Sequence, residues 1–211
     1  MHVIIGAYRG VELATRAIAS LMEHANGIHG LTVVDDSGRA DDRIALRSLP
    51  AVDRVVPVAD GQAGYNAAMQ RVCEIAGDDP FVFWEEDFEL LASIDFYDMG
   101  QKLAERPHLA QLALLRGPHF PIEHEHGGLL EALAVRLPGS VLGEVDGVIE
   151  QVGTFTCNPS VWAEGIAARG WPAGGYSEDL KRDELLAEGY RFGFLPDVRV
   201  RHDGERTGFD Y

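Results

Sequence analysis

The chain has 211 residues, of which 46% are hydrophobic and 9% aromatic, a composition typical of one globular domain and not of a disordered chain. Its 34 acidic residues outnumber the 18 Lys and Arg residues and give a net charge of −16, which argues against binding along nucleic-acid phosphates or on anionic membranes. No apolar run is long enough to cross a membrane and the first ten residues lack a secretory signal, so we expect a cytoplasmic protein that does not contact membranes.

The N-terminal half alternates between strand and helix patterns. Strands are predicted at residues 2–6, 31–35, 54–58 and 81–84, and helices at residues 11–27 and 65–77. Pro57 marks the third strand as an edge strand, because proline cannot donate a hydrogen bond to a neighbouring strand. The residues expected on the buried helix faces are Val11, Ala14, Ile18, Leu21, Met22 and Ala25 in the first helix and Ala68, Val72 and Ile75 in the second. This order of elements is typical of a Rossmann-like α/β fold with a mostly parallel sheet.

The C-terminal half is less regular. Helices are predicted at residues 94–107 and 177–189, and strands at residues 109–115 and 197–202. Ser177 is expected to be the N-cap of the second of these helices, and residues 117–150 are expected to form loops with one or two antiparallel strands. The sequence therefore predicts one domain over residues 1–211, with a smaller antiparallel part in its C-terminal half.

Acidic residues follow two of the predicted strands. Asp35 and Asp36 end the second strand, and Glu85, Glu86 and Asp87 come directly after four bulky apolar residues. Open parallel sheets bind ligands beyond the carboxyl ends of their strands, so we expect these acids and the turn after the first strand to share one ligand-binding edge. Three consecutive acids suit a divalent cation, because Mg²⁺ and Mn²⁺ prefer oxygen ligands. The alternative is a solvated acidic turn.

Several segments together resemble the family 2 glycosyltransferases with the GT-A fold. The similar segments are IIGAYRGVEL (4–13), LTVVDDSG (31–38), GQAGYNAAM (61–69), FVFWEEDFEL (81–90) and the late stretch GGYSEDLKRDELLAEGYRFGFLPDVRVRHDG (174–204). The fourth resembles the D-x-D motif of that family, with Glu85 in the position of the first aspartate. The order and spacing of the segments, over nearly the whole chain, carry the resemblance.

The resemblance implies a role for each of these segments. A nucleoside-diphosphate sugar would contact Ala7, Tyr8, Arg9, Asp35, Asp36, Asn66, Glu85 and Glu86. Asp87 and His202 would bind the divalent metal, Mn²⁺ or Mg²⁺. The acidic pair Glu178 and Asp179 would supply the general base, and Asp179, the second member, is the expected one. The alternative for this pair is structural, because acids in a first helical turn are stabilised by the helix dipole.

The expected function is therefore a metal-dependent, inverting glycosyltransferase. Residues 1–91 would bind the nucleotide sugar, and residues 92–211 would bind the acceptor and carry the catalytic base. The acceptor would be a protein, a small molecule or a modified nucleic acid. The histidine-rich segment 117–128 is expected to be a loop that orders over the acceptor rather than a second metal site.

Two other functions stay open at this point. A nucleotidyltransferase on a similar scaffold would need a basic, glycine-rich loop after the first strand, and GAYRGVE has two glycines but only one arginine. A non-catalytic nucleotide-sugar-binding protein is compatible with Glu85 in place of the family's aspartate. A P-loop and a G-x-G-x-x-G motif are both missing from the sequence, which disfavours the enzymes that depend on them.

Overall fold

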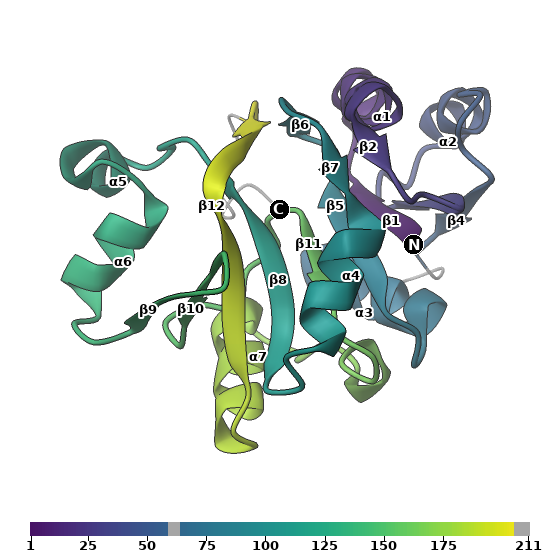
Figure 1. Cartoon of the computed structure of the whole chain (residues 1–211). Coiled ribbons are helices and arrows are strands. Elements are labelled where there is room, and N and C mark those ends of the chain that lie inside the picture. Colours follow the sequence, from purple (N-terminus) through teal and green to yellow (C-terminus); the bar gives the residue numbers. More distant parts are fainter. Residues whose placement is uncertain (59–63, 205–211) are drawn as a thin grey trace.

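The computed structural model describes residues 1–58 and 64–204, which form a central sheet covered by helices (Figure 1). Its strands are β1 (His2–Ala7), β2 (Ala25–Asn26), β3 (Gly30–Asp35), β4 (Arg54–Pro57), β5 (Phe81–Glu85), β6 (Phe88–Leu90), β7 (Ile94–Asp95), β8 (Leu109–Arg116), β9 (Val141–Val145), β10 (Val148–Gln151), β11 (Ser160–Trp162) and β12 (Arg191–His202). Its helices are α1 (Val11–His24), α2 (Ala40–Arg47), α3 (Tyr65–Ala76), α4 (Phe96–Ala104), α5 (Pro121–His126), α6 (Leu129–Arg136), the 3₁₀ turn η1 (Ala167–Arg169) and α7 (Ser177–Ala187). Among the described residues, no helix combines the length and the apolar character needed to cross a membrane.

Within the described residues, ten strands form one sheet in the order β4-β3-β1-β5-β11-β8-β12-β10-β9, with β6 paired to the end of β12. Strands β4, β3, β1 and β5 are parallel to one another, and β8 is parallel to β12. Strand β11 runs antiparallel between β5 and β8, and β10, β9 and β6 add further antiparallel pairs. The predicted Rossmann-like α/β class is confirmed, with its antiparallel part in the C-terminal half, and Pro57 lies on the edge strand β4 as predicted.

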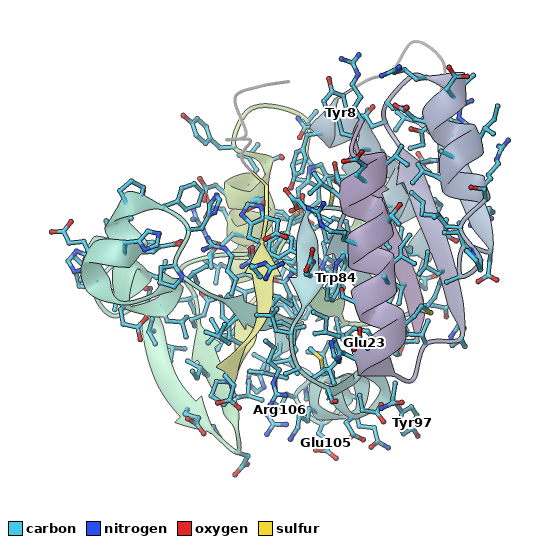
Figure 2. All side chains as sticks on the ribbon, turned by 90° about the horizontal axis from the view of Figure 1, so that it is seen from above. Tyr8, Glu23, Trp84, Tyr97, Glu105 and Arg106 are labelled. Atoms are coloured by element: carbon cyan, nitrogen blue, oxygen red, sulfur yellow. The ribbon has the colours of Figure 1, made fainter. Side chains whose placement is uncertain are left out.

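The two faces of the sheet are covered by different helices. One apolar cluster joins the sheet to α1, α2 and α4, and a second joins it to α3, η1 and α7. Strand β5 contributes Val82 and Trp84 to the first cluster and Phe81 and Phe83 to the second, and each of these side chains is at most 1% exposed. Trp84 lies in the interior (Figure 2), where its indole N–H donates to the carbonyl of Phe88 at 2.9 Å. The strand has no polar residue before Glu85 because both of its faces are buried.

The predicted helices of the N-terminal half are present, and Ala14, Ile18, Leu21 and Val72 are buried as predicted, whereas other predicted inward positions are not. Met22 is 47% exposed, because it lies about 100° around the helix from the buried Leu21 and only one of the two can face the sheet. Ala25 lies beyond the end of α1, in β2. In α3 the most buried positions are those next to the predicted Ala68 and Ile75, which are only partly buried.

Residues 117–150 differ most from the prediction. They contain the helices α5 and α6, which lie together at one end of the sheet beyond β12 (Figure 1), besides the predicted antiparallel strands β9 and β10. Helix α5 has only six residues, too few to display an apolar period, and it ends at Gly127 in the left-handed conformation. Ser177 is the first residue of α7 and not its N-cap, which is Tyr176.

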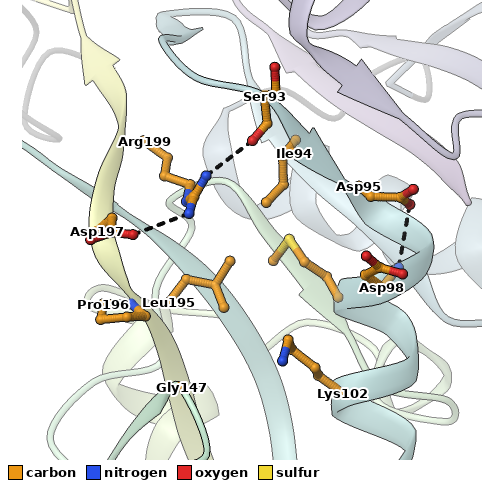
Figure 3. A pocket seen from close by; sticks show the side chains of 11 residues that line it. Ser93, Ile94, Asp95, Asp98, Lys102, Gly147, Leu195, Pro196, Asp197 and Arg199 are labelled. Carbon is orange, nitrogen blue, oxygen red and sulfur yellow. Dashed lines mark hydrogen bonds and ion pairs between the residues drawn. The ribbon is translucent and has the colours of Figure 1, made fainter.

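A cavity of about 290 Å³ lies between α4 and β12 (Figure 3). Its lining residues are Ser93, Ile94, Asp95, Asp98, Met99, Lys102, Gly147, Leu195, Pro196, Asp197 and Arg199. Arg199 donates to the carbonyl of Ser93 at 3.0 Å and to the carboxylate of Asp197 at 3.2 Å. None of the predicted site residues lines this cavity, so it is separate from the candidate active site.

Candidate active site

The carboxyl ends of β1, β3 and β5 meet at one edge of the sheet. Ala7 lies opposite Asp35 in the β1–β3 ladder, and Gly6 lies opposite Glu85 in the β1–β5 ladder. The amide of Asp36 continues this pairing, donating to the carbonyl of Ala7 at 2.9 Å. The predicted convergence of these strand ends on one edge is confirmed.

Glu86, the middle acid of the three, fixes the turn after β1. Its Oε1 accepts a hydrogen bond from the amide of Tyr8 at 2.9 Å. A Cβ at Gly10 would lie 3.0 Å from the Glu86 side chain, so glycine allows this close approach. Arg9 follows in the left-handed region at φ 53°, and its guanidinium lies 5.1 Å from the centre of the Tyr8 ring. The predicted donor-binding turn is therefore held in shape by an acid from the turn that follows β5.

The two acids at the end of β3 shape the loops around them. Asp35 is buried, accepts from the amide of Ser37 at 3.0 Å and forms an ion pair with Arg43 at 2.9 Å. Both carboxylate oxygens of Asp36 lie 3.1 Å from the amide of Gly64, at the start of α3. Burial raises the pKa of Asp36, and the Gly64 amide partly opposes that shift. Contact of either acid with a nucleotide stays a prediction.

Asp87 and His202 form a pair between β6 and β12. Asp87 Oδ2 lies 3.0 Å from His202 Nε2, and the two side chains are 19% and 14% exposed. The His202 ring stacks on Phe88, with 4.5 Å between ring centres, and meets the edge of the His119 ring, with 4.1 Å between centres. Packing on both sides fixes the imidazole in place.

One buried atom of each partner in this pair is unsatisfied. Asp87 Oδ1 and His202 Nδ1 are buried and have no hydrogen-bond partner among the described residues. A buried polar atom without a partner is costly, and such atoms often mark the site of a bound ion. A carboxylate and an imidazole fit a divalent cation of the Mn²⁺ type. Over residues 1–58 and 64–204, no group of three or more His, Cys, Asp and Glu side chains is arranged to hold a metal. Among the described residues, Asp87 and His202 are therefore two candidate ligands, and a bound phosphate and water would supply the others.

The acidic pair at the start of α7 points in two directions. Glu178 Oε1 accepts from the hydroxyl of Tyr65 at 3.0 Å and from the amide of Cys157 at 3.3 Å. Burial raises the pKa of Glu178. Asp179 is 57% exposed at its side chain and forms an ion pair with Arg182 at 2.6 Å, one turn further along the helix. Only Glu178 faces the interior of the site.

Glu85 is influenced by the charges of both Asp87 and Glu178. It is the last residue of β5 and shares the sheet face of Phe83, so it points toward α3 and α7. Burial raises the pKa of Glu85 well above its ordinary value, and the charges of Asp87, Glu178 and Glu86 raise it further. The pKa of Glu85 therefore depends on the charge of Asp87 and on the charge of Glu178 in α7.

Asn66 connects the start of α3 to the segment that leads into α7. Its side chain donates to the carbonyl of Gly174 at 2.7 Å and accepts from the indole of Trp171 at 3.4 Å. Trp171 is 8% exposed and stacks on Trp162, so it belongs to the core. Residues 61–63 of the segment 61–69, which resembles the glycosyltransferase family in sequence, lie outside the described residues.

A buried ion pair beside the site was not predicted from the sequence. Arg116 binds both carboxylate oxygens of Glu123, at 2.5 and 2.8 Å, and the two side chains are 6% and 7% exposed. Glu123 also accepts from the amides of His119 at 2.8 Å and Phe120 at 3.1 Å. This anchors the start of α5 and places His119 against His202. A charged residue ending the otherwise buried strand β8 was the signal in the sequence, because such a charge needs a partner.

Known proteins match this chain in structure and not in sequence. No family model matches it, and no curated protein does. The mannosyltransferase PcManGT from Pyrobaculum calidifontis, in complex with GDP-Man and Mn²⁺, matches with a TM-score of 0.68 and 16% identity, covering 97% of this chain and 57% of that one. TarS of S. aureus, residues 1–349 in complex with UDP-GlcNAc, matches with a TM-score of 0.66 and 13% identity, covering 98% of this chain and 59% of that one.

The chain has a glycosyltransferase fold. The fold that the sequence resemblance implied is therefore confirmed by structures that share few residues with the chain. The present chain spans less than three fifths of the length of either matching chain. Activity, donor and acceptor are accordingly matters for proposal.

Proposed function

We propose that the chain is a metal-dependent, inverting glycosyltransferase that moves a sugar from a nucleoside-diphosphate sugar to an acceptor hydroxyl. The observation that carries this proposal is the Asp87–His202 pair, with its two unsatisfied buried atoms, at the ligand-binding edge of a sheet with this fold. Mn²⁺ and GDP-Man are bound together by one protein of the same fold, which supports the pairing of metal and donor here.

The proposed donor site lies along the ends of β1, β3 and β5. The residues proposed to contact the nucleotide sugar are Ala7, Tyr8, Arg9, Asp35, Asp36, Asn66, Glu85 and Glu86. A diphosphate entering this acidic edge needs positive charge, because the chain carries a net charge of −16. Asp87 and His202 would hold the cation, which when bound neutralises the charge that builds on the leaving diphosphate.

The general base is proposed to be Glu178, the first member of the pair that the sequence singled out. Its inward direction and its contacts with Tyr65 and Cys157 support this choice over Asp179, which is exposed and paired with Arg182. The acceptor oxygen would bond to the anomeric carbon while the bond from that carbon to the diphosphate oxygen breaks. The hydroxyl proton passes to Glu178, the bonding electrons leave with the diphosphate, and the configuration inverts.

Donor hydrolysis tests this proposal without knowledge of the acceptor, because water can replace it. The protein is incubated with GDP-mannose, UDP-GlcNAc and other nucleotide sugars, with Mn²⁺ or with EDTA, and the released nucleoside diphosphate is measured by chromatography. We expect release of the diphosphate from one donor class with Mn²⁺ and none with EDTA. Binding without release would indicate a non-catalytic protein. Pyrophosphate formed from a nucleoside triphosphate and a sugar phosphate would indicate a nucleotidyltransferase.

A further inference from the structure

Two hydrogen-bond donors from separate parts of the chain meet on one oxygen of Glu178. Tyr65 is the first residue of α3, and its hydroxyl donates to Oε1 at 3.0 Å across 113 residues of sequence. The amide of Cys157, in the segment before β11, donates to the same oxygen at 3.3 Å. Two donors in different directions fix both the position and the rotation of the carboxylate.

The Tyr65 hydroxyl is itself held in place. The Tyr65 ring packs edge-on against Trp171, with 6.1 Å between ring centres and 81° between planes, and Trp171 stacks on Trp162. The neighbouring Asn66 ties α3 to Trp171 and to Gly174, just before α7. The donor and the acceptor of the Tyr65–Glu178 bond are thus joined by a second set of contacts, which keeps their separation constant.

We propose that Tyr65 is a positioning residue, which holds Oε1 of Glu178 so that the other oxygen, Oε2, is the atom that takes the acceptor's proton. This inference rests on the proposed function, in which Glu178 is the general base. Nothing in the family resemblance assigns a role to Tyr65, which is visible only from its contact with α7.

The same contacts explain how a buried acid stays usable as a base. Burial raises the pKa of Glu178 and is the largest influence on it, and the nearby Asp179 raises it further, while the bonds from Tyr65 and Cys157 lower it. The charge of Glu178 in turn raises the pKa of Glu85. The hydrogen bonds from the Tyr65 hydroxyl and from the side chain and amide of Cys157 stabilise the ionised form that accepts a proton, and burial keeps that form basic.

The test is the variant Tyr65→Phe, which removes the hydroxyl and keeps the ring against Trp171. The matched control is Tyr97→Phe on α4, at the periphery of the molecule (Figure 2), where the side chain is 60% exposed.

For the nucleotide sugar that the wild type hydrolyses with Mn²⁺, kcat and KM are measured across pH. We expect Tyr65→Phe to lower kcat roughly 10- to 100-fold, as for a lost hydrogen bond to a charged group, with KM unchanged. The acidic limb of its pH profile moves to higher pH, because the carboxylate has lost a stabilising donor. Tyr97→Phe leaves kcat, KM and the profile as in the wild type.

A double variant separates positioning from folding. If Tyr65 acts through Glu178, then Tyr65→Phe has no further effect once Glu178→Gln has removed the base, and the double variant is as slow as Glu178→Gln alone. Wild-type kcat and pH profile in Tyr65→Phe overturn the inference, and so do rate losses that multiply in the double variant. A wild type that hydrolyses no nucleotide sugar refutes the proposed function instead, so the two failures are distinguishable.

Discussion

The buried ion pair of Arg116 and Glu123 allows a quantitative test of how the fold anchors the segment beside the candidate metal site. Glu123→Gln keeps the size and shape of the side chain but removes its charge, and leaves the guanidinium of Arg116 buried without a counter-charge. Removing one partner of a buried pair costs about 3–5 kcal/mol. For a domain of this size 1 kcal/mol shifts the Tm by about 2–4 °C. The expected Tm is therefore lower than that of the wild type by roughly 6–20 °C.

The assay is thermal and urea unfolding followed by circular dichroism, with Glu125→Gln as the control. Glu125 lies in the same helix, is exposed, and has no ion pair among the described residues, so its variant should unfold within about 0.5 kcal/mol of the wild type. A loss of less than about 1 kcal/mol in Glu123→Gln would refute the assignment of a strong buried pair.

The pH dependence of this difference follows from the pKa of Glu123. Burial alone would raise that pKa, but the hydrogen bonds from Arg116 and from the amides of His119 and Phe120 outweigh burial and lower it. A carboxyl with a lowered native pKa stabilises the fold fully above its unfolded value of about 4.3, and that contribution is lost as the pH falls through the native pKa. The gap between wild type and Glu123→Gln should therefore narrow in acid, and a gap that widens there contradicts the reasoning.

Four further variants test the proposed metal site, the donor site and the general base. Asp87→Asn should abolish the Mn²⁺-dependent rise in Tm that GDP or UDP gives the wild type. An equal rise in Tm of the wild type in EDTA would show that Asp87 and His202 do not bind a metal together with the diphosphate. Asp36→Ala should weaken binding of the same diphosphate, measured by calorimetry, while the protein stays folded. Wild-type affinity in this variant would show that the nucleotide does not bind at the end of β3. Glu178→Gln should slow donor hydrolysis by about 10² to 10⁴ with donor binding unchanged. Asp179→Asn should stay within a few fold of the wild-type rate, and the reverse pattern would assign the base to Asp179.

The fold could be predicted because its signals are local and strong. Residues 81–84 are apolar on both faces since helices cover both sides of β5, and that alone indicates a buried, parallel type of strand. Gly77 and Gly189, the last residues of the predicted helices 65–77 and 177–189, follow the ends of α3 and α7 with positive φ, as glycines at helix ends often do. The strand-end acids converge because parallel strands have their carboxyl ends on one edge, whatever the loops between them do.

The direction of the acidic pair in α7 could not be predicted for a geometric reason. Neighbouring residues on a helix point about 100° apart, so one of Glu178 and Asp179 had to face outward. Which one does so depends on how α7 is docked, and contacts with Tyr65 and Asn66, more than 100 residues earlier in the chain, contribute to that docking. Ser177 does not indicate how α7 is docked, since it is the first helical residue and not the N-cap.

The three acids at the end of β5 point in different directions, although the charges of Glu86 and Asp87 still raise the pKa of Glu85. A continued strand would have placed Glu85 and Asp87 on one side, but the strand ends at Glu85 and a turn follows. Glu86 then turns back to the amide of Tyr8, Glu85 lies on the sheet face of Phe83, and Asp87 reaches His202 on β12. Of the three, Asp87 alone has a buried oxygen left without a partner among the described residues. The run that looked in the sequence like one ligand cluster is therefore divided, with Glu86 bonded to the Tyr8 amide and Asp87 to His202. A metal bound here would depend on one carboxylate, one imidazole and the ligand that it neutralises.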